Sequence, residues 1–241
     1  MLRFRLFGIP IEIHISFLII AVLGPRSSVA AVSLWVGAVF IAILLHELGH
    51  GLTAKAFGAR KVSITLYGLG GLTSFTEGEQ PMSHGRSFTI SAMGSGVGIV
   101  AGLAIIGLGR LGMFDRWPDA SIDFLGYFVF AALVWGILNW IPIMPLDGGH
   151  MVLHLIAVFD ERRAPLIAQI VTWTAVAIAV PVAIVNGFVF AAIIVVVFAF
   201  MGLGDFLRTN HEPRARDTAG GEPPGVSPPQ EPPKDPPTFP I

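Results

Sequence analysis

The sequence predicts a membrane protein, an all-α bundle of about six transmembrane helices with a small membrane-associated β-hairpin or sheet and a disordered, proline-rich C-terminal tail. Of its 241 residues, 54% are hydrophobic and only 13% are charged, whereas a soluble domain carries about 25% charged residues. Ten prolines and no apolar run occupy residues 209–241, which is typical of an unstructured, partly polyproline segment. We therefore expect a membrane core over residues 1–208 and a cytoplasmic tail over 209–241.

The predicted spans follow the apolar runs, which cover residues 15–23, 29–57, 88–108, 124–141, 166–185 and 188–206. The first run has nine residues, short for a spanning helix of about 20, so the sequence leaves open whether it crosses fully. A cleaved signal peptide is an alternative for the N-terminal region. However, Pro10 and Glu12 interrupt the apolar stretch that such a signal needs.

Two segments have the alternating pattern of β-strands. Residues 3–14 alternate around apolar positions and are interrupted by Gly8 and Pro10, which predicts a short edge strand at the membrane surface. Residues 61–75 alternate at Val62, Ile64 and Leu66 and then reach several glycines. This pattern predicts a hairpin or a sheet edge.

Charge distribution predicts the orientation in the membrane. If both termini are inside, twelve of the fifteen Lys and Arg residues lie inside, and only Arg26, Arg110 and Arg116 lie outside. We therefore expect a multi-pass protein of the cell membrane, in contact with the lipid bilayer, with cytoplasmic N- and C-termini. The net charge of −1 says nothing about nucleic acid, but no basic patch with interleaved aromatic residues is present, so we expect no nucleic-acid partner.

The second apolar run contains His46-Glu47-Leu48-Gly49-His50. Residues four apart lie on the same helix face, so His46 and His50 can offer two imidazole nitrogens to one metal ion. Glu47 lies about 100° further round the helix, close enough to act on a water molecule at the metal without being a ligand. This is the H-E-x-x-H pattern of zinc hydrolases. A chance match is the alternative, but charged groups in a spanning helix are costly and mark functional sites.

A second polar cluster follows the fourth run, in the segment from Asn139 to His150. Because the second span runs inward, the third outward and the fourth inward, Asp147 is expected on the same side as His50 and at similar depth. This position favours Asp147 as the third protein ligand of a site that keeps one position open. The chain has no cysteine, so only histidine and carboxylate remain as strong ligands. Other candidates for the third ligand remain: Glu77, Glu79, His84, His150 and His154.

Together the two motifs resemble the site-2 protease family of intramembrane zinc metalloproteases. The resemblance rests on HELGH at His46–His50 and on the family's N-x-x-P-x-x-x-L-D-G pattern, which begins at Asn139 and ends at Gly148. It covers about residues 1–206. Where the family often has Ala-Gly-Pro, this chain has Met93-Gly94-Ser95, and its loops predict a compact form without a PDZ or CBS domain.

The resemblance implies one zinc ion held by His46, His50 and Asp147, with Glu47 as the catalytic base. It implies cleavage of transmembrane substrate proteins within or near the bilayer, and the family pattern gives Asn139 a role in binding the substrate backbone or the oxyanion. Two alternatives remain, a zinc-binding scaffold that does not cleave and a metal transporter. The tail could also bind a partner protein, although an unstructured linker is the simpler interpretation.

A transmembrane substrate must also be unwound before it is cleaved, and its exposed backbone groups then need partners. We therefore expect the substrate to add a strand to the edge of the segment after the zinc helix. The residues predicted to bind it are Ile64, Leu66, Gly70, Gly71 and the helix-breaking Pro142.

Overall fold

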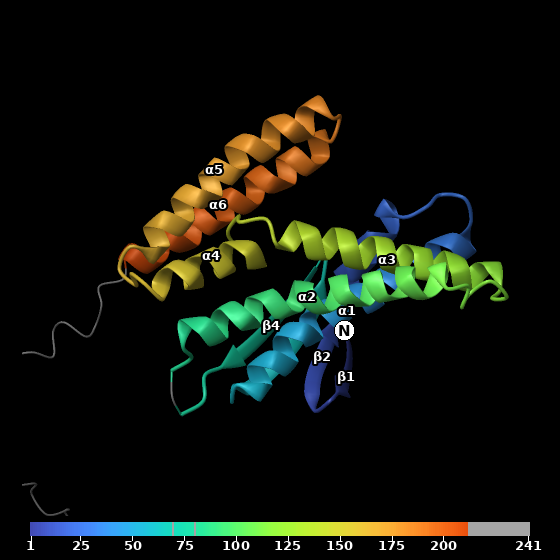
Figure 1. Ribbon diagram of the computed structural model, residues 1–241, viewed down its shortest axis with the longest axis horizontal. Coiled ribbons are helices and arrows are strands. Elements are labelled where there is room, and N and C mark those ends of the chain that lie inside the picture. The colour runs from blue at the N-terminus through green and yellow to red at the C-terminus, as the bar shows by residue number, and fades with distance from the viewer. Residues whose placement is uncertain (69, 80, 212–241) are drawn as a thin grey trace, which may run out of the picture.

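Long helices and one small sheet make up the computed structural model, which describes residues 1–68, 70–79 and 81–211 (Figure 1). The strands are β1 (Leu2–Leu6), β2 (Ile9–Ile13), β3 (Arg60–Tyr67) and β4 (Gly70–Thr76). The helices are the 3₁₀ helix η1 (Ile15–Leu23), α1 (Val29–Ala56), α2 (His84–Arg110), α3 (Asp119–Asn139), α4 (Asp147–Ala157), α5 (Ala164–Val185) and α6 (Val189–His211).

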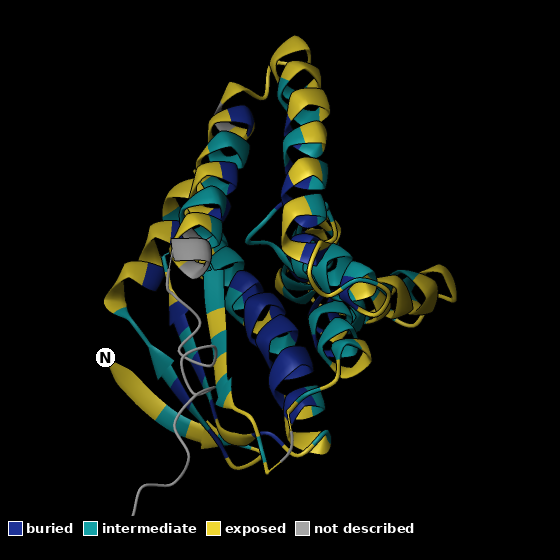
Figure 2. Cartoon of the chain, turned by 90° about the vertical axis from the view of Figure 1, so that its left-hand side faces the viewer, coloured by how far each residue is buried: buried dark blue, intermediate teal, exposed yellow. Residues whose placement is uncertain are grey.

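Helix α1 is the centre of the fold. It begins at the Ser28 cap, whose hydroxyl accepts a hydrogen bond from the Ala31 amide, and its 28 residues extend about 42 Å. Helices α2 and α3 pack against it and against each other. The sheet covers its C-terminal half, where Gly51 approaches Ile9, Val62 and Ile64. Buried residues therefore gather along this half of α1 and the strands that face it (Figure 2).

Five helices in the described part of the chain are long and apolar enough to cross a membrane, namely α1, α2, α3, α5 and α6. The chain is a membrane protein, as predicted. The first apolar run, residues 15–23, was counted among the six predicted spans. It forms η1, whose nine residues rise only about 18 Å. It lies beside the N-terminal half of α1, where Trp35 Nε1 donates to the Ile20 carbonyl at 2.9 Å.

The sheet has four strands in the order β1-β2-β3-β4, with antiparallel outer pairs and a parallel β2–β3 pair. The segment 3–14, expected as one edge strand, forms a hairpin that turns at Phe7 and Gly8, both with positive φ. The predicted hairpin after α1 is present as β3 and β4. However, β3 is paired on both sides, and its Ile64 and Leu66 side chains are fully buried. The expectation that these two residues form the free edge is therefore wrong, and the unpaired edge of the hairpin belongs to β4.

After α3 the chain leaves helical structure between residues 140 and 146 and resumes it at Asp147, the first residue of α4. Helix α4 packs against α2 and α5, and α5 and α6 form an antiparallel pair set away from the α1–α3 bundle (Figure 1). Helix α6 ends at His211, so residues 209–211 of the predicted tail belong to this helix. The rest of the predicted tail lies outside the described residues.

Candidate metal centre

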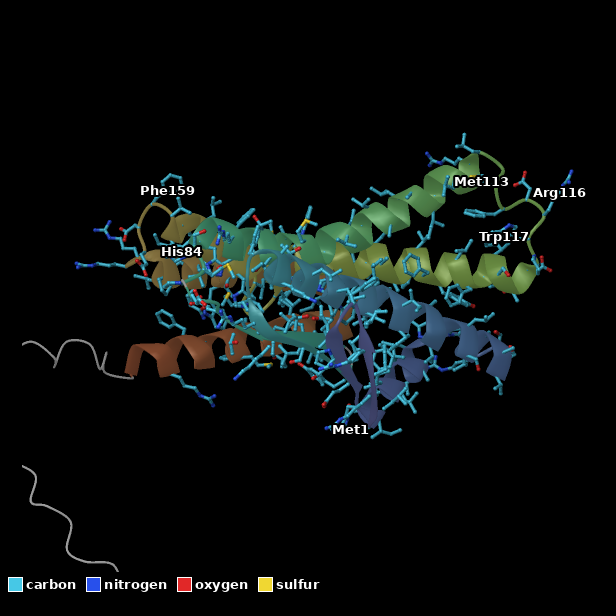
Figure 3. All side chains as sticks on the ribbon, turned by 90° about the horizontal axis from the view of Figure 1, so that it is seen from below. Met1, His84, Met113, Arg116, Trp117 and Phe159 are labelled. Atoms are coloured by element: carbon cyan, nitrogen blue, oxygen red, sulfur yellow. The ribbon has the colours of Figure 1, made fainter. Side chains whose placement is uncertain are left out.

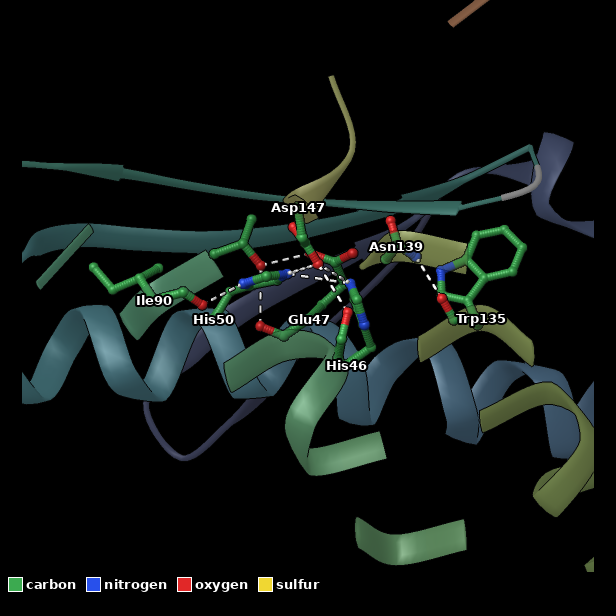
Figure 4. Close-up of polar contacts among 9 residues, drawn as sticks. His46, Glu47, His50, Ile90, Trp135, Asn139 and Asp147 are labelled. Atoms are coloured by element: carbon green, nitrogen blue, oxygen red, sulfur yellow. Dashed lines mark hydrogen bonds and ion pairs between the residues drawn. The ribbon is translucent and has the colours of Figure 1, made fainter. Parts of the chain in front are cut away.

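Three side chains from two distant parts of the sequence meet beside α1. His46 and His50 lie one turn apart on α1, and Asp147 reaches them from the start of α4 (Figure 4). The Nε2 atoms of the two histidines are 3.1 Å apart, and Asp147 Oδ2 lies 3.3 Å from each of them. Among the described residues, this is the one group of three or more His, Cys, Asp or Glu side chains gathered closely enough for a shared metal ion.

The triangle of donor atoms has the size that zinc requires. Tetrahedral zinc with bonds of about 2.0–2.1 Å separates its ligand atoms by about 3.3 Å, which matches the three distances above. Two imidazole nitrogens and one carboxylate oxygen are also a donor set that catalytic zinc sites use, with a fourth position open. These residues therefore fit a zinc ion in number, chemistry and spacing.

Neighbouring groups orient two of the three donors. His50 Nδ1 donates to the Ile90 carbonyl at 2.8 Å, which leaves the lone pair on Nε2. The hydroxyl of Ser95, fully buried on α2, donates to Asp147 Oδ2 at 3.2 Å. His46 Nδ1 is buried and has no hydrogen-bond partner in the described part of the chain. The polar contacts of the His46 ring are therefore those of Nε2, with Asp147 and His50.

Burial and charge act in opposite directions on Asp147. Burial raises the pKa of its carboxyl, but hydrogen bonds and the charges of His46 and His50 outweigh burial and hold that pKa well below its usual range. The carboxylate is therefore ionised at neutral pH, as a metal ligand must be.

A close approach between α1 and α2 makes this geometry possible. A Cβ added at Gly94 would lie 2.1 Å from His50 Nε2 and 2.2 Å from Cε1, and one at Gly49 would lie 2.5 Å from the Met93 carbonyl oxygen. Only glycine fits at these two positions. Gly94 and Ser95 belong to the segment that stands in place of the family's Ala-Gly-Pro, in which Gly94 keeps the glycine and Ser95 replaces the proline. This comparison was the one signal in the sequence that singled them out.

The side chain of Glu47, on α1, lies between this helix and the sheet and is 4% exposed. Its Oε2 accepts a hydrogen bond of 2.7 Å from the Thr73 hydroxyl on β4. A Cβ at Gly71, also on β4, would lie 2.5–2.7 Å from Cγ, Oε1 and Cδ of Glu47. The edge strand therefore packs directly on this side chain. Thr73 was not predicted, because nothing in the local sequence relates it to the histidine motif.

The remaining predicted site residues lie nearby in different settings. Asn139 ends α3, and its amide nitrogen donates to the Trp135 carbonyl of the same helix at 2.9 Å (Figure 4). Pro142 is half-buried in the segment that joins α3 to α4. Gly70 and Gly71 begin β4.

None of the alternative third ligands joins the donor triangle. Glu79 is exposed and pairs with Arg60, and Glu77 is exposed in the same connection. His84 is the first residue of α2, and its ring lies 5.8 Å from that of His154 on α4. Burial, with the neighbouring His150 and His84, lowers the pKa of His154 to about 4.

Fold and site together define a membrane protein that holds two histidines and an aspartate around one point, with a glutamate beside them. A zinc metalloprotease of Methanocaldococcus jannaschii is 29% identical over 157 residues, which cover 61% of this chain and 43% of that protein. A putative zinc metalloprotease of Synechocystis is 30% identical over 145 residues, with 58% and 37% covered. The chain thus spans less than half the length of these relatives. No family model matches it.

The structural comparison concerns the fold. The site-2 protease from Methanocaldococcus jannaschii superposes with a TM-score of 0.58 at 21% identity, covering 85% of this chain and 94% of that one. The resemblance drawn from the two motifs is confirmed: the chain has the site-2 protease fold and is related in sequence to proteins named zinc metalloprotease.

Proposed function

We propose that this protein is an intramembrane zinc metalloprotease that hydrolyses peptide bonds of transmembrane substrate proteins within or near the bilayer. The observation that carries the proposal is the donor triangle of His46, His50 and Asp147 with Glu47 next to it, inside a chain that crosses the membrane several times. A charged constellation at this depth is costly unless it binds an ion or does chemistry.

His46, His50 and Asp147 would hold one zinc ion per chain. When bound, zinc supplies a Lewis acid that activates water and polarises a carbonyl. Ile90 keeps the His50 lone pair available, and Ser95 holds the carboxylate of Asp147 against the two imidazoles. These contacts fix the ligands before the ion arrives and so favour zinc over a loosely held cation.

Glu47 is the general base of the proposed reaction. It takes a proton from the attacking water and passes it to the leaving amine. Its burial beside β4 excludes bulk water from the carboxylate. Asn139 is a weaker candidate for binding the substrate backbone or the oxyanion, because its amide nitrogen is already bonded within α3.

The substrate is proposed to add a strand to β4. The His14 amide donates to the Leu66 carbonyl across the β2–β3 ladder, so Leu66 directs its backbone away from β4. Gly71, its partner on β4, therefore directs its own N–H and C=O to the free edge. Thr73, two residues on, does the same. An unwound substrate paired with these groups would lie directly over Glu47.

Cross-linking tests this docking site, because the chain has no native cysteine. A cysteine at Ser74 on β4 should cross-link to a cysteine near the substrate's cleavage site, whereas one at Ser63 on the paired strand β3 should not. Equal cross-linking from both positions would contradict docking at the β4 edge. The cleavage assay described below tests the protease function separately and does not depend on this result.

We also propose that the protein lies in the cell membrane with the zinc end of α1 facing the cytoplasm. His84 and Phe159 lie at one end of the molecule, and Met113, Arg116 and Trp117 at the other (Figure 3). The charge distribution of the sequence supports this orientation, because it puts twelve of the fifteen Lys and Arg residues on the cytoplasmic side. Reporters fused after residue 241 should be active in the cytoplasm, and activity only outside it would contradict the orientation.

Cleavage by purified protein tests the function. Wild type in detergent or in a bilayer should cut a model single-pass substrate, and Glu47→Gln should bind zinc equally but not cut. A scaffold would bind zinc without cleaving in either form, and a transporter would move zinc into vesicles. A wild-type protein that holds zinc and leaves every tested membrane substrate intact would refute the proposal.

A further inference from the structure

Thr73 connects two parts of the site that have separate functions. Its hydroxyl lies 2.7 Å from Glu47 Oε2 and 3.0 Å from the Glu47 carbonyl oxygen. Its backbone belongs to β4, the outer strand of the sheet. One residue therefore contacts the proposed base through its side chain and borders the free edge through its main chain.

The strand geometry explains how both contacts arise. Side chains alternate along a strand, and from Gly71 onward the half-buried positions of β4 are Gly71, Thr73 and Phe75, whereas Leu72 and Ser74 are exposed. The half-buried set faces α1. Thr73 pairs with Ile64, two residues from Leu66, so its N–H and C=O point away from β3 as those of Gly71 do.

We propose that Thr73 is a positioning residue that fixes the Glu47 carboxylate for proton transfer, an inference that rests on the proposed protease function. A glutamate carboxylate rotates freely about its last bond unless a partner holds it. The hydroxyl of Thr73 binds Oε2 and leaves Oε1 to accept the proton. Because Gly71 lies close to Oε1 and Cδ of the same carboxylate and leaves no room for a Cβ there, β4 restricts both the rotation and the position of the carboxylate.

The proposed role of Thr73 also links substrate docking at β4 to catalysis by Glu47. A substrate strand that pairs with the edge of β4 orders the strand whose Thr73 side chain holds the base. Substrate binding then favours the reactive orientation of Glu47 without touching that side chain. Loss of the hydroxyl should therefore lower kcat and leave KM close to the wild-type value, because the backbone edge is unchanged.

The test compares Thr73→Val, which keeps the shape but removes the hydroxyl, with Thr73→Ser, which keeps the hydroxyl. A hydrogen bond to a charged group corresponds to about a 10- to 100-fold change in an equilibrium or rate. We expect Thr73→Val to lose about 10- to 100-fold in kcat with wild-type zinc content and KM, and Thr73→Ser to recover most of the activity. If Thr73→Val fails to fold, Thr73→Ala against Thr73→Ser decides in the same way.

Thr76→Val is the matched control, because the Thr76 hydroxyl on the same strand bonds only the Arg60 carbonyl in the described structure. It should retain wild-type kcat. A wild-type kcat in Thr73→Val, or equal losses in the Val and Ser variants, would overturn the positioning role. A wild-type protein that cleaves nothing would instead refute the protease function, so the two failures are distinct.

Discussion

Replacing Gly94 by alanine should disrupt the metal centre more than any comparable change on α2. The added Cβ would lie 2.2 Å from His50 Cε1, short of a favourable carbon contact by about 1.3 Å. The ring cannot move away cheaply, because Nδ1 is bonded to Ile90 and Nε2 faces His46 and Asp147. Either α1 and α2 separate or the ring leaves its position.

The expected losses of stability and of activity follow from the overpacking between α1 and α2 and from the displacement of the His50 ring. Overpacking a tight interface destabilises by about 1–3 kcal/mol, and a displacement of about 1 Å at a reacting group can lower activity by about 100-fold. Gly94→Ala should therefore bind less zinc, measured by elemental analysis of the purified protein, and should cleave substrate about 100-fold more slowly.

Gly96→Ala is the matched control on the same helix. No atom lies within 4 Å of a Cβ at Gly96, and alanine is a better helix former by about 1 kcal/mol. This variant should keep its zinc and be at least as stable as wild type. If Gly94→Ala retains the zinc content and activity of Gly96→Ala, the close approach of α2 to His50 does not shape the site.

Three further predictions concern other residues near the centre. Gly71→Ala should abolish cleavage but retain zinc, because its Cβ would displace Glu47 and not a metal ligand. Gly85→Ala is the control, because a Cβ there meets open space, and equal activity in the two variants would show that the packing of Gly71 on Glu47 does not matter. Ser95→Ala should weaken zinc binding about 10-fold or more in a chelator competition, because Asp147 loses its hydrogen-bond donor; unchanged affinity would exclude this role. Stability should fall as the pH drops from 6.5 toward 4, because the folded protein keeps His154 neutral while the unfolded chain takes up a proton; thermal unfolding of His154→Gln should depend less on pH over this interval, and an identical dependence would contradict the prediction.

Local sequence carried enough information to predict much of the site. The spacing of His46 and His50 and the position of Glu47 follow from helix geometry alone, and the order of the spans brought Asp147 to the same depth. The structure places these four side chains together. The alternation at Val62, Ile64 and Leu66 likewise predicted a strand, and β3 includes all three residues.

The pattern of a strand does not say which of its edges is free. Period-two alternation records which face is buried, whereas pairing on either side depends on strands from elsewhere in the chain. Here β2, from before α1, covers the inner edge of β3. This arrangement moves the proposed docking edge to β4. Similarly, the apolar content of residues 15–23 made them a candidate span whose full crossing the sequence left open. In the structure these nine residues form the 3₁₀ helix η1 beside α1.

The sequence by itself determined the membrane setting, the strand character of the segment after α1 and the chemical identity of the centre, because hydropathy, periodicity and helical spacing are local properties. The tertiary structure alone decided what surrounds that centre. Thr73, Gly71, Gly94 and Ser95 lie on β4 and α2, and they reach Glu47, His50 and Asp147 only because the sheet and α2 pack against α1. Such contacts depend on interatomic distances between distant segments, and no spacing along the chain encodes them.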